Sequence, residues 1–307
     1  MTRHTTHPAE GAPGAGAGDA LAASAREIGA RAAGQAGGEN FPVALRLLPR
    51  RYRQHLGALY GFARSVDDMG DEAPKQERLA LLDEMEADVR RLYRPAAADV
   101  ADGPRLGVVQ ALRPLVTQCG VPMQPFLDLV EANRQDQVVT RYQTFADLVA
   151  YCRLSANPVG RVVLYVFGAA TPAREELSDY VCTALQLAEH WQDVAEDYQA
   201  GRIYLPREDM DSAGCREADL AEPTASEPLR ALLAFEATRA RELLDRGAPL
   251  VGTLRGAARA AVAGYVAGGR AALAAVTATG ADVLVSTPKP RPARVAAELA
   301  RSYATGR

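Results

Sequence analysis

Apolar residues recur every three or four positions along nearly the whole chain, and this spacing is the strongest constraint on its fold. From Phe41 onward, few segments alternate apolar and polar residues with the period of two that a half-buried strand requires. The spacing and the turn residues that interrupt it predict helices over roughly 43–70, 75–94, 105–119, 123–137, 144–169, 173–199, 225–247, 250–279 and 290–304. The sequence therefore predicts an all-α fold.

The body of the chain contains no proline- or serine-rich linker, and 307 residues suffice for one large core. We therefore predict a single helical domain over residues 37–285, followed by a C-terminal helix or tail over 286–307. Residues 1–36 hold few large apolar side chains and are predicted to be a disordered N-terminal tail. Pro49 is expected to kink or split the first helix.

Charge, hydropathy and cysteine content exclude several classes of protein. The longest uncharged apolar run near the middle, Val162–Ala170, falls short of the roughly 20 apolar residues that a membrane-spanning helix needs. A net charge of −3 without a basic block argues against a nucleic-acid partner. The four cysteines form no C-x-x-C pair or Cys/His cluster, so neither a zinc site nor a disulfide framework is predicted, and a reduced cytoplasm fits best. Nothing in the sequence indicates an oligomeric state.

The first acidic motif runs from Arg64 to Glu72, at the end of the first predicted helix. Asp67 and Asp71 are four residues apart, so their carboxylates leave the same helix face. The same stripe carries two arginines and a phenol further back: Arg64, Tyr60 and Arg53. A solvated helix end in which Arg64 pairs with Asp68 would explain the motif structurally. Because no lysine or arginine within 66–73 offsets the four acids, the motif also fits a cation site.

The second acidic motif runs from Gln186 to Asp197. Its polar stripe steps by three, four and four residues through Gln186, Glu189, Asp193 and Asp197. Alone, it would fit an amphipathic surface helix. Two such stripes on separate long helices could instead face each other across a bundle and hold Mg²⁺ or Mn²⁺, because these cations prefer oxygen ligands. Phosphate oxygens commonly complete such coordination, so a diphosphate is the expected ligand.

Other metal centres fit the sequence less well. A di-iron bundle needs Glu-x-x-His pairs, and none of the four histidines provides one. Haem and zinc sites lack ligands for the same reason. His190 lies beside the second acidic stripe, where a lone histidine is more often a structural hydrogen-bonding group than a catalytic one.

The third motif runs from Tyr151 to Arg161 and combines small residues with a proline. Ser155, Ala156 and Gly160 are small, and Pro158 is expected to bend or interrupt the helix. Tight helix packing around a kink explains part of this pattern. A kinked helix with small side chains also leaves room for a ligand beside it.

Four separated segments together resemble one family, the squalene/phytoene synthases, which join two prenyl diphosphates head to head. These segments are Glu39–Ala44 with Leu47–Pro49, Tyr60–Glu72, Tyr151–Gly160 and Leu185–Pro206. The resemblance covers about Asn40–Val283 and implies a single-domain, isoprenoid-synthase-type helical bundle around a central cavity. Within the family, the sequence is most similar to the bacterial hydroxysqualene synthase branch.

The resemblance implies roles for particular residues. Mg²⁺ ligands are implied at Asp67, Asp68, Asp71, Asp193 and Asp197. Glu189 stands where the family usually has asparagine, which puts its place in the ligand set in question. Positions that bind the diphosphate are implied at Arg64 and Arg202, with Arg53, Tyr60 and Gln186 on the same stripes as further candidates. Active-site tyrosines are implied at Tyr151 and Tyr265, and the candidates to admit water are Ser155 and Asn157.

The implied reaction converts presqualene diphosphate and water to hydroxysqualene and diphosphate, in squalene and hopanoid biosynthesis. Mg²⁺ or Mn²⁺ would assist ionisation, and a cavity of Leu, Val and Phe side chains would shield the carbocation. The chain has no dinucleotide fingerprint, and Lys75 stands alone near the first motif, so we expect no NADPH. Because the product is an oil, an apolar portal could dock peripherally on the inner face of the membrane.

Two other functions remain open on the sequence. The first is another head-to-head synthase that makes presqualene diphosphate, squalene or phytoene from prenyl diphosphates. The second is a catalytically silent relative that acts as a binding or assembly factor. Intact carboxylates at Asp67, Asp71, Asp193 and Asp197 argue against the silent relative.

Overall fold

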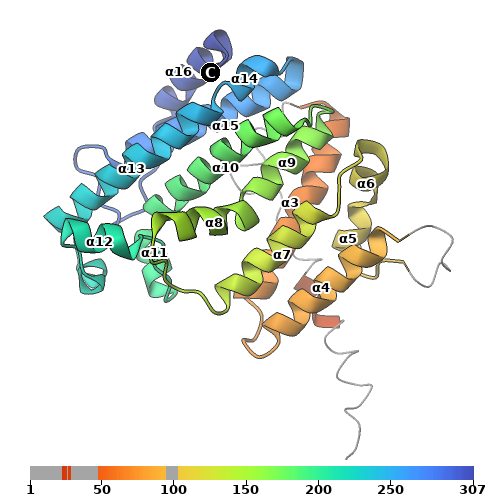
Figure 1. Ribbon diagram of the computed structural model, residues 1–307, viewed down its shortest axis with the longest axis horizontal. Helices are drawn as coiled ribbons and strands as arrows, with labels where there is room; N and C mark the ends of the chain where they lie inside the picture. The colour runs from red at the N-terminus through yellow and green to blue at the C-terminus, as the bar shows by residue number, and fades with distance from the viewer. Residues whose placement is uncertain (1–22, 26, 29–47, 95–102) are drawn as a thin grey trace, which may run out of the picture.

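Helices build the described part of the protein, which in this computed structural model comprises residues 23–25, 27, 28, 48–94 and 103–307 (Figure 1). The helices are α3 Arg50–Asp71, α4 Arg78–Leu92, α5 Gly107–Ala111, α6 Arg113–Cys119, α7 Gln124–Asp136, α8 Phe145–Ser155, α9 Asn157–Val166, α10 Pro172–Gln192, α11 Val194–Gln199, α12 Arg207–Ala213, the 3₁₀-helix η2 Glu217–Ala221, α13 Glu227–Gly247, α14 Leu250–Thr253, α15 Gly256–Val276 and α16 Pro292–Thr305. Within these ranges, extended pairing is limited to an isolated bridge between Arg141 and Ile203. The predicted all-α class is confirmed.

Apolar spacing explains why α3 forms and which face it buries. Its buried face carries large apolar residues at intervals of three and four: Leu56, Leu59, Phe62, Val66 and Met69. Pro49 precedes this helix as its N-cap and does not kink it. Proline is favoured at a helix start because the backbone N–H that it lacks would have no acceptor within the helix there.

Several long predicted helices are divided in the structure. The segment predicted over 144–169 breaks at Ala156, because Pro158 suits the first turn of a new helix rather than the interior of an old one. The segment predicted over 173–199 breaks at Asp193, whose backbone leaves the helical region. The helices α12 and η2 were not predicted, since both are too short to show a clear apolar period.

The described residues of the N-terminal region correct one expectation. Residues 23–25, 27 and 28 are helical, and Ala25 is buried against the core with Ile28 packed beside it. Their spacing of three residues places both on one helix face, so this stretch is not part of a disordered tail. The remaining residues of the predicted tail and the Glu39–Ala44 segment lie outside the described residues.

Helix α10 lies among α8, α9, α13 and α15 and contacts all four of them (Figure 1). Small residues permit these close approaches: a Cβ atom added to Gly160 would lie 2.5 Å from the Ser178 hydroxyl oxygen of α10. Arg161 reinforces the same contact through two hydrogen bonds to Asp179, of 3.0 and 2.6 Å. Tight helix packing is therefore the observed role of Gly160.

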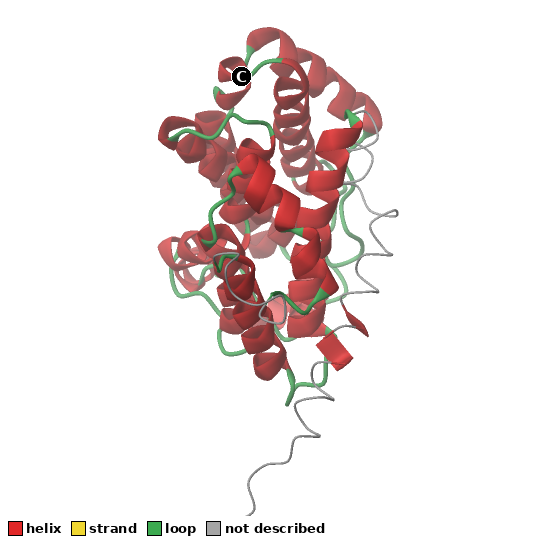
Figure 2. Cartoon of the chain, turned by 90° about the vertical axis from the view of Figure 1, so that its right-hand side faces the viewer, coloured by secondary structure: helices red, strands yellow, loops and turns green. Residues whose placement is uncertain are grey.

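Among the residues that the structure describes, two apolar clusters form the core. The first cluster includes Trp191 of α10 and Leu244 of α13. The second includes Phe62 of α3 and Phe126 of α7. Figure 2 shows the same helices from the side. No helix in the described part of the chain is both long and apolar enough to cross a membrane. The two acidic motifs come from opposite clusters, and this origin places them on opposite walls of one site.

Candidate active site

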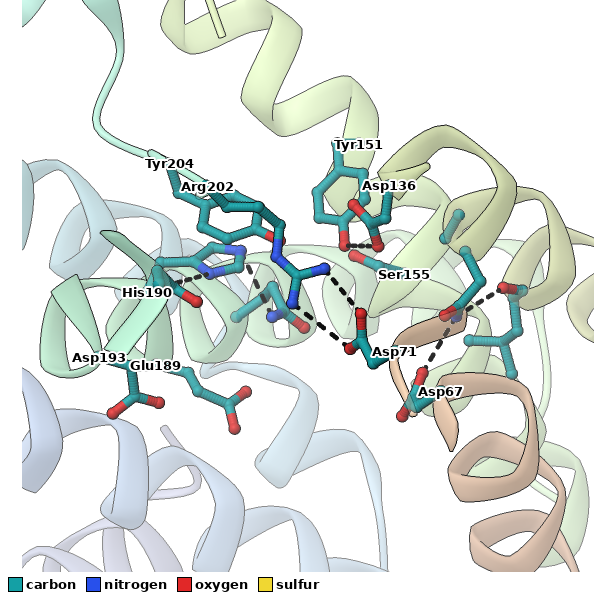
Figure 3. Close-up of a pocket in the computed structure, with 15 residues that line it drawn as sticks. Asp67, Asp71, Asp136, Tyr151, Ser155, Glu189, His190, Asp193, Arg202 and Tyr204 are labelled. Atoms are coloured by element: carbon teal, nitrogen blue, oxygen red, sulfur yellow. Dashed lines mark hydrogen bonds and ion pairs between the residues drawn. The ribbon is translucent and has the colours of Figure 1, made fainter. Parts of the chain in front are cut away.

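Both acidic motifs open into one cavity of about 300 Å³ (Figure 3). Its walls come from α3, α7, α8, α10, α11 and the link that follows α11. The lining residues are Asp67, Asp71, Leu129, Ala132, Asn133, Asp136, Tyr151, Ser155, Gln186, Glu189, His190, Asp193, Asp197, Arg202 and Tyr204. The expected meeting of the two acidic stripes across one cavity is thus confirmed.

Asp67 forms part of the α3 wall and is held by α7. The Asn133 amide donates a hydrogen bond of 3.0 Å to the Asp67 carboxylate. The surrounding protein shields this carboxylate from bulk water, and this desolvation raises its pKa to about 6. The Asn133 hydrogen bond opposes the shift, and the Asp71 charge adds to it. A cation in the cavity would relieve this repulsion and favour the ionised carboxylate.

Asp193 stands on the opposite wall, at the break between α10 and α11. Burial raises its pKa to about 6, and the charges of Glu196 and Asp197 add to the effect. Two facing walls therefore carry carboxylates with raised pKa values. Such an arrangement costs free energy when it is empty and gains from a bound cation.

Arg202, in the link that follows α11, reaches across the cavity to Asp71 of α3. Its guanidinium donates hydrogen bonds of 2.8 and 3.4 Å to the two carboxylate oxygens of Asp71 (Figure 3). Burial alone would lower the pKa of Arg202, but the ion pair with Asp71 holds it above its ordinary value. A permanent, directed cation therefore lies inside an otherwise acidic cavity, where it can bind a diphosphate oxygen.

Aromatic rings form another wall. The His190 imidazole stacks on the Tyr204 ring, with centroids 3.7 Å apart and planes 13° from parallel. The Tyr151 ring lies 5.8 Å from that of Tyr204. Burial lowers the pKa of His190, so its ring is neutral despite the Asp197 carboxylate at 3.9 Å. These π faces can stabilise a positive charge.

The lining differs from the apolar one that was predicted. In the described residues, Leu129 and Ala132 are its only aliphatic members, and neither valine nor phenylalanine contributes. The expectation of a Leu, Val and Phe cavity is therefore wrong for this space. Buried valine and phenylalanine side chains, such as Phe62 and Val162, instead pack within the two core clusters, because α3, α9 and their neighbours meet there directly.

Asp136 was missed by the sequence analysis. The Tyr151 hydroxyl donates a hydrogen bond of 2.8 Å to Asp136. Burial raises the pKa of Asp136 to about 7; the Tyr151 hydrogen bond and the Arg202 charge oppose the shift, while the charges of Asp71 and Asp67 add to it. A weak signal was present, since Asn133 and Asp136 are polar residues three apart at the end of an otherwise apolar helix face.

The structure brings together most, but not all, of the residues that the sequence analysis selected. Those at the cavity are Asp67, Asp71, Tyr151, Ser155, Gln186, Glu189, Asp193, Asp197 and Arg202. Those that do not line it are Arg53, Tyr60, Arg64, Asp68, Asn157 and Tyr265.

Helix rotation and packing explain why Asp68, Asn157 and Tyr265 do not line the cavity. Asp68 follows Asp67 by about 100° of helix rotation, which turns it into the protein, where the Arg64 guanidinium pairs with it at 2.7 Å. The pairing of Arg64 with Asp68 that the sequence suggested is therefore present. Asn157 accepts a hydrogen bond of 3.0 Å from Thr183 in the buried contact between α9 and α10. Tyr265 packs against the core cluster of α3 and α4.

A testable consequence concerns Gly70, which lets α3 and α7 meet. A Cβ atom at position 70 would lie 2.5 Å from the side-chain oxygen of Asn133. The amide nitrogen of the same side chain donates the hydrogen bond to Asp67. We expect Gly70→Ala to lower the free energy of unfolding by about 1–3 kcal/mol, because a packed contact must move. The matched control is Gly57→Ala in the same helix, where nothing lies within 4 Å. Urea denaturation should show the control to be unchanged or slightly stabilised; equal losses in both variants would contradict the prediction.

The acidic residues of the cavity offer a metal ion only carboxylate oxygen atoms. Within the described residues, no group of three or more His, Cys, Asp or Glu side chains is gathered closely enough to hold a metal by itself. The carboxylates instead stand on facing walls of the cavity. Their oxygen-only chemistry fits Mg²⁺ or Mn²⁺, provided that ligand oxygens complete the coordination between the walls.

Comparisons with known proteins agree with this geometry. The squalene/phytoene synthase family model matches residues 35–298. The hydroxysqualene synthase of Rhodopseudomonas palustris is 35% identical over 222 residues, which cover 71% of this chain and 72% of that protein. The phytoene synthase of Mycobacterium tuberculosis is 32% identical over 218 residues, covering 69% and 68%. The crystal structure of squalene synthase HpnC from Alicyclobacillus acidocaldarius superposes with a TM-score of 0.73 at 38% identity, covering 84% of this chain and 94% of that one. The chain therefore belongs to the squalene/phytoene synthase family, whose enzymes condense or ionise prenyl diphosphates.

Proposed function

We propose that this enzyme is a hydroxysqualene synthase, which converts presqualene diphosphate and water to hydroxysqualene and diphosphate. The observation that carries the proposal is that the two acidic walls, Arg202 and the aromatic wall share one cavity. Similarity to the hydroxysqualene synthase of Rhodopseudomonas palustris supports this branch of the family.

The charged residues would bind and ionise the diphosphate end of the substrate. Mg²⁺ or Mn²⁺ held by Asp67, Asp71, Asp193 and Asp197, with Glu189 beside them, would neutralise charge on the leaving diphosphate. Arg202 would exchange its hydrogen bonds from Asp71 to a diphosphate oxygen, so its positive charge is in place before the C–O bond breaks.

The aromatic residues would protect the organic cation that ionisation leaves. The rings of Tyr151, Tyr204 and the neutral His190 contact one another, and all three residues line the cavity. Burial raises the pKa of Tyr151 well above its ordinary value, so the phenol keeps its proton and does not act as a nucleophile. Hydroxysqualene is an oil, and we place the enzyme in the cytoplasm, with peripheral contact to the inner face of the membrane for product release.

A second candidate is another head-to-head synthase of presqualene diphosphate, squalene or phytoene. It is favoured by the similarity to a phytoene synthase and by the solved structure named as a squalene synthase. The third candidate, a silent relative with a binding or assembly role, is disfavoured because carboxylates and Arg202 converge on one cavity.

Product analysis separates these candidates. The purified protein is incubated with Mg²⁺ and either presqualene diphosphate or farnesyl diphosphate, in water labelled with heavy oxygen, with and without NADPH. We expect presqualene diphosphate to be consumed at the same rate in both cases and labelled hydroxysqualene to form. NADPH-dependent squalene without a labelled alcohol, or condensation of farnesyl diphosphate alone, would support the second candidate instead.

A further inference from the structure

A polar cluster of Asp136, Tyr151 and Ser155 lies on the cavity wall formed by α7 and α8 (Figure 3). Tyr151 donates its hydroxyl hydrogen to one Asp136 oxygen, Oδ2, at 2.8 Å. Ser155 follows Tyr151 by one helical turn and so projects from the same face of α8. None of the three is among the residues proposed to hold the metal ions or the diphosphate.

Two atoms of this cluster lack hydrogen-bond partners. Asp136 Oδ1 and Ser155 Oγ are both buried, and neither has a partner among the residues that the structure describes. Burying an unpaired oxygen costs free energy, so such atoms commonly mark the place of a water molecule or a small polar ligand. A water at this wall would accept or donate at Ser155 and donate to Asp136.

The surroundings leave Asp136 as the suitable proton acceptor on this wall. The charged and titratable groups that act on it are Asp67 and Asp71 from α3, Tyr142 and Tyr151 beside or on α8, and Arg202 and Tyr204 from the link after α11. Burial raises the pKa of each tyrosine far above its ordinary value, so none accepts a proton. His190 contacts Gln186 at 3.4 Å and Asp197 at 3.9 Å, which direct its two ring nitrogens elsewhere.

We propose that Asp136 is the catalytic base that takes the proton from the water that quenches the carbocation, and that Ser155 holds this water. Tyr151 acts as a positioning residue through its hydrogen bond to the Asp136 carboxylate. This inference rests on the proposed function, since a hydride-quenched synthase needs no such base.

The proposed step balances without any further reactant. The C–O bond to the diphosphate breaks, and its electron pair leaves with the diphosphate. The cyclopropylcarbinyl cation so formed rearranges, and a lone pair of the water oxygen then forms the new C–O bond to a ring carbon. As it does so, a C–C bond of the ring breaks, and the electron pair of that bond forms a carbon–carbon double bond at the cationic carbon. One proton of that water passes to Asp136 Oδ1 and later to solvent, so presqualene diphosphate and water become hydroxysqualene, diphosphate and a proton.

The test compares two readouts in Asp136→Asn, Ser155→Ala and the wild-type enzyme. Each is given presqualene diphosphate and Mg²⁺ in water labelled with heavy oxygen, and both diphosphate release and the labelled-alcohol fraction of the products are measured. The matched control is Asp128→Asn, the same change on the same helix, at a residue that hydrogen-bonds Gln124 outside the cavity. We expect Asp136→Asn to retain most diphosphate release, while its alcohol fraction falls by about tenfold or more and hydrocarbons formed by proton loss replace it. Ser155→Ala should show a smaller fall in the same direction, and the control none.

The outcomes separate this inference from the function on which it rests. A wild-type enzyme that forms no labelled alcohol overturns the proposed function. If the wild type forms it and both variants keep its full alcohol fraction, the role of Asp136 is overturned and the function stands. Loss of diphosphate release in step with alcohol in a folded Asp136→Asn protein also overturns it, by assigning Asp136 to ionisation. If circular dichroism shows that this variant is unfolded, an unchanged alcohol fraction in Ser155→Ala overturns the proposed water site.

Discussion

Replacing either Asp67 or Asp193 by asparagine should lower the turnover of presqualene diphosphate by about 10³-fold or more while the helical fold is kept. The two residues stand on opposite walls of one cavity, so each variant removes charge from a different side of the diphosphate site. An amide neither carries the charge nor binds Mg²⁺ comparably. In Asp67→Asn, the new amide oxygen can still accept the hydrogen bond from Asn133, so the packing of α3 against α7 should survive.

The pKa values predict the accompanying change in stability. Both carboxyl groups have pKa values raised to about 6, above the ordinary 3.8, so their ionised forms are disfavoured in the metal-free folded protein. A neutral amide removes this disadvantage at neutral pH. Without Mg²⁺, thermal unfolding of the variants should therefore begin no lower than in the wild type, and addition of Mg²⁺ with diphosphate should stabilise them less.

Asp68 offers an internal control within the same motif. Its carboxylate is turned away from the cavity and paired with Arg64, so Asp68→Asn should affect stability more than turnover. The assignment of the α3 wall would be wrong if Asp68→Asn abolished turnover and Asp67→Asn did not. Steady-state kinetics with a diphosphate-release assay measures the turnover of both variants, and thermal unfolding measures their stability.

Replacing Arg202 by glutamine should lower kcat/KM by about 10²–10³-fold. The guanidinium is the charged donor that reaches across the cavity to Asp71, and glutamine supplies neither its charge nor its two parallel N–H groups. Arg202→Lys should recover only part of the loss, since a lysine binds as a point charge without the bidentate geometry. Inhibition by inorganic diphosphate should weaken in the same order.

Arg64→Gln is the control for this prediction. Arg64 is also an arginine of the acidic motifs, but it pairs with Asp68 and Glu72 and does not line the cavity. We expect its effect on kcat/KM to be much smaller than that of Arg202→Gln. Equal losses in the two variants would show that the effect reflects general charge and not the position of Arg202.

Much of the fold could be predicted because helix formation depends on neighbours in the sequence. The recurrence of Leu56, Leu59, Phe62 and Val66 indicates a helix and its buried face before any partner is known. The breaks were harder to place. Pro158 indicated an interruption that the structure locates at Ala156, whereas the break at Asp193 has no proline or glycine to announce it.

The candidate site was predictable only as far as residues on one helix are concerned. Spacing placed Asp67 and Asp71 on one face of α3, but whether Asp68 or Asp67 turns toward a ligand depends on how that helix is rotated against its neighbours. Asp136 joins the site because α7 packs against α3 at Gly70, a contact between residues more than 60 positions apart.

The sequence by itself determined the all-α class, the approximate helices and the two acidic stripes, because each follows from side chains within a few turns of one another. Only the tertiary structure decided that Arg202 meets Asp71 across 131 residues, that Asp136 and Tyr151 share a hydrogen bond, and that Asp68 and Asn157 turn away. These outcomes depend on how whole helices interlock, since close packing permits only particular rotations and approaches. No local period in the sequence encodes which faces will meet.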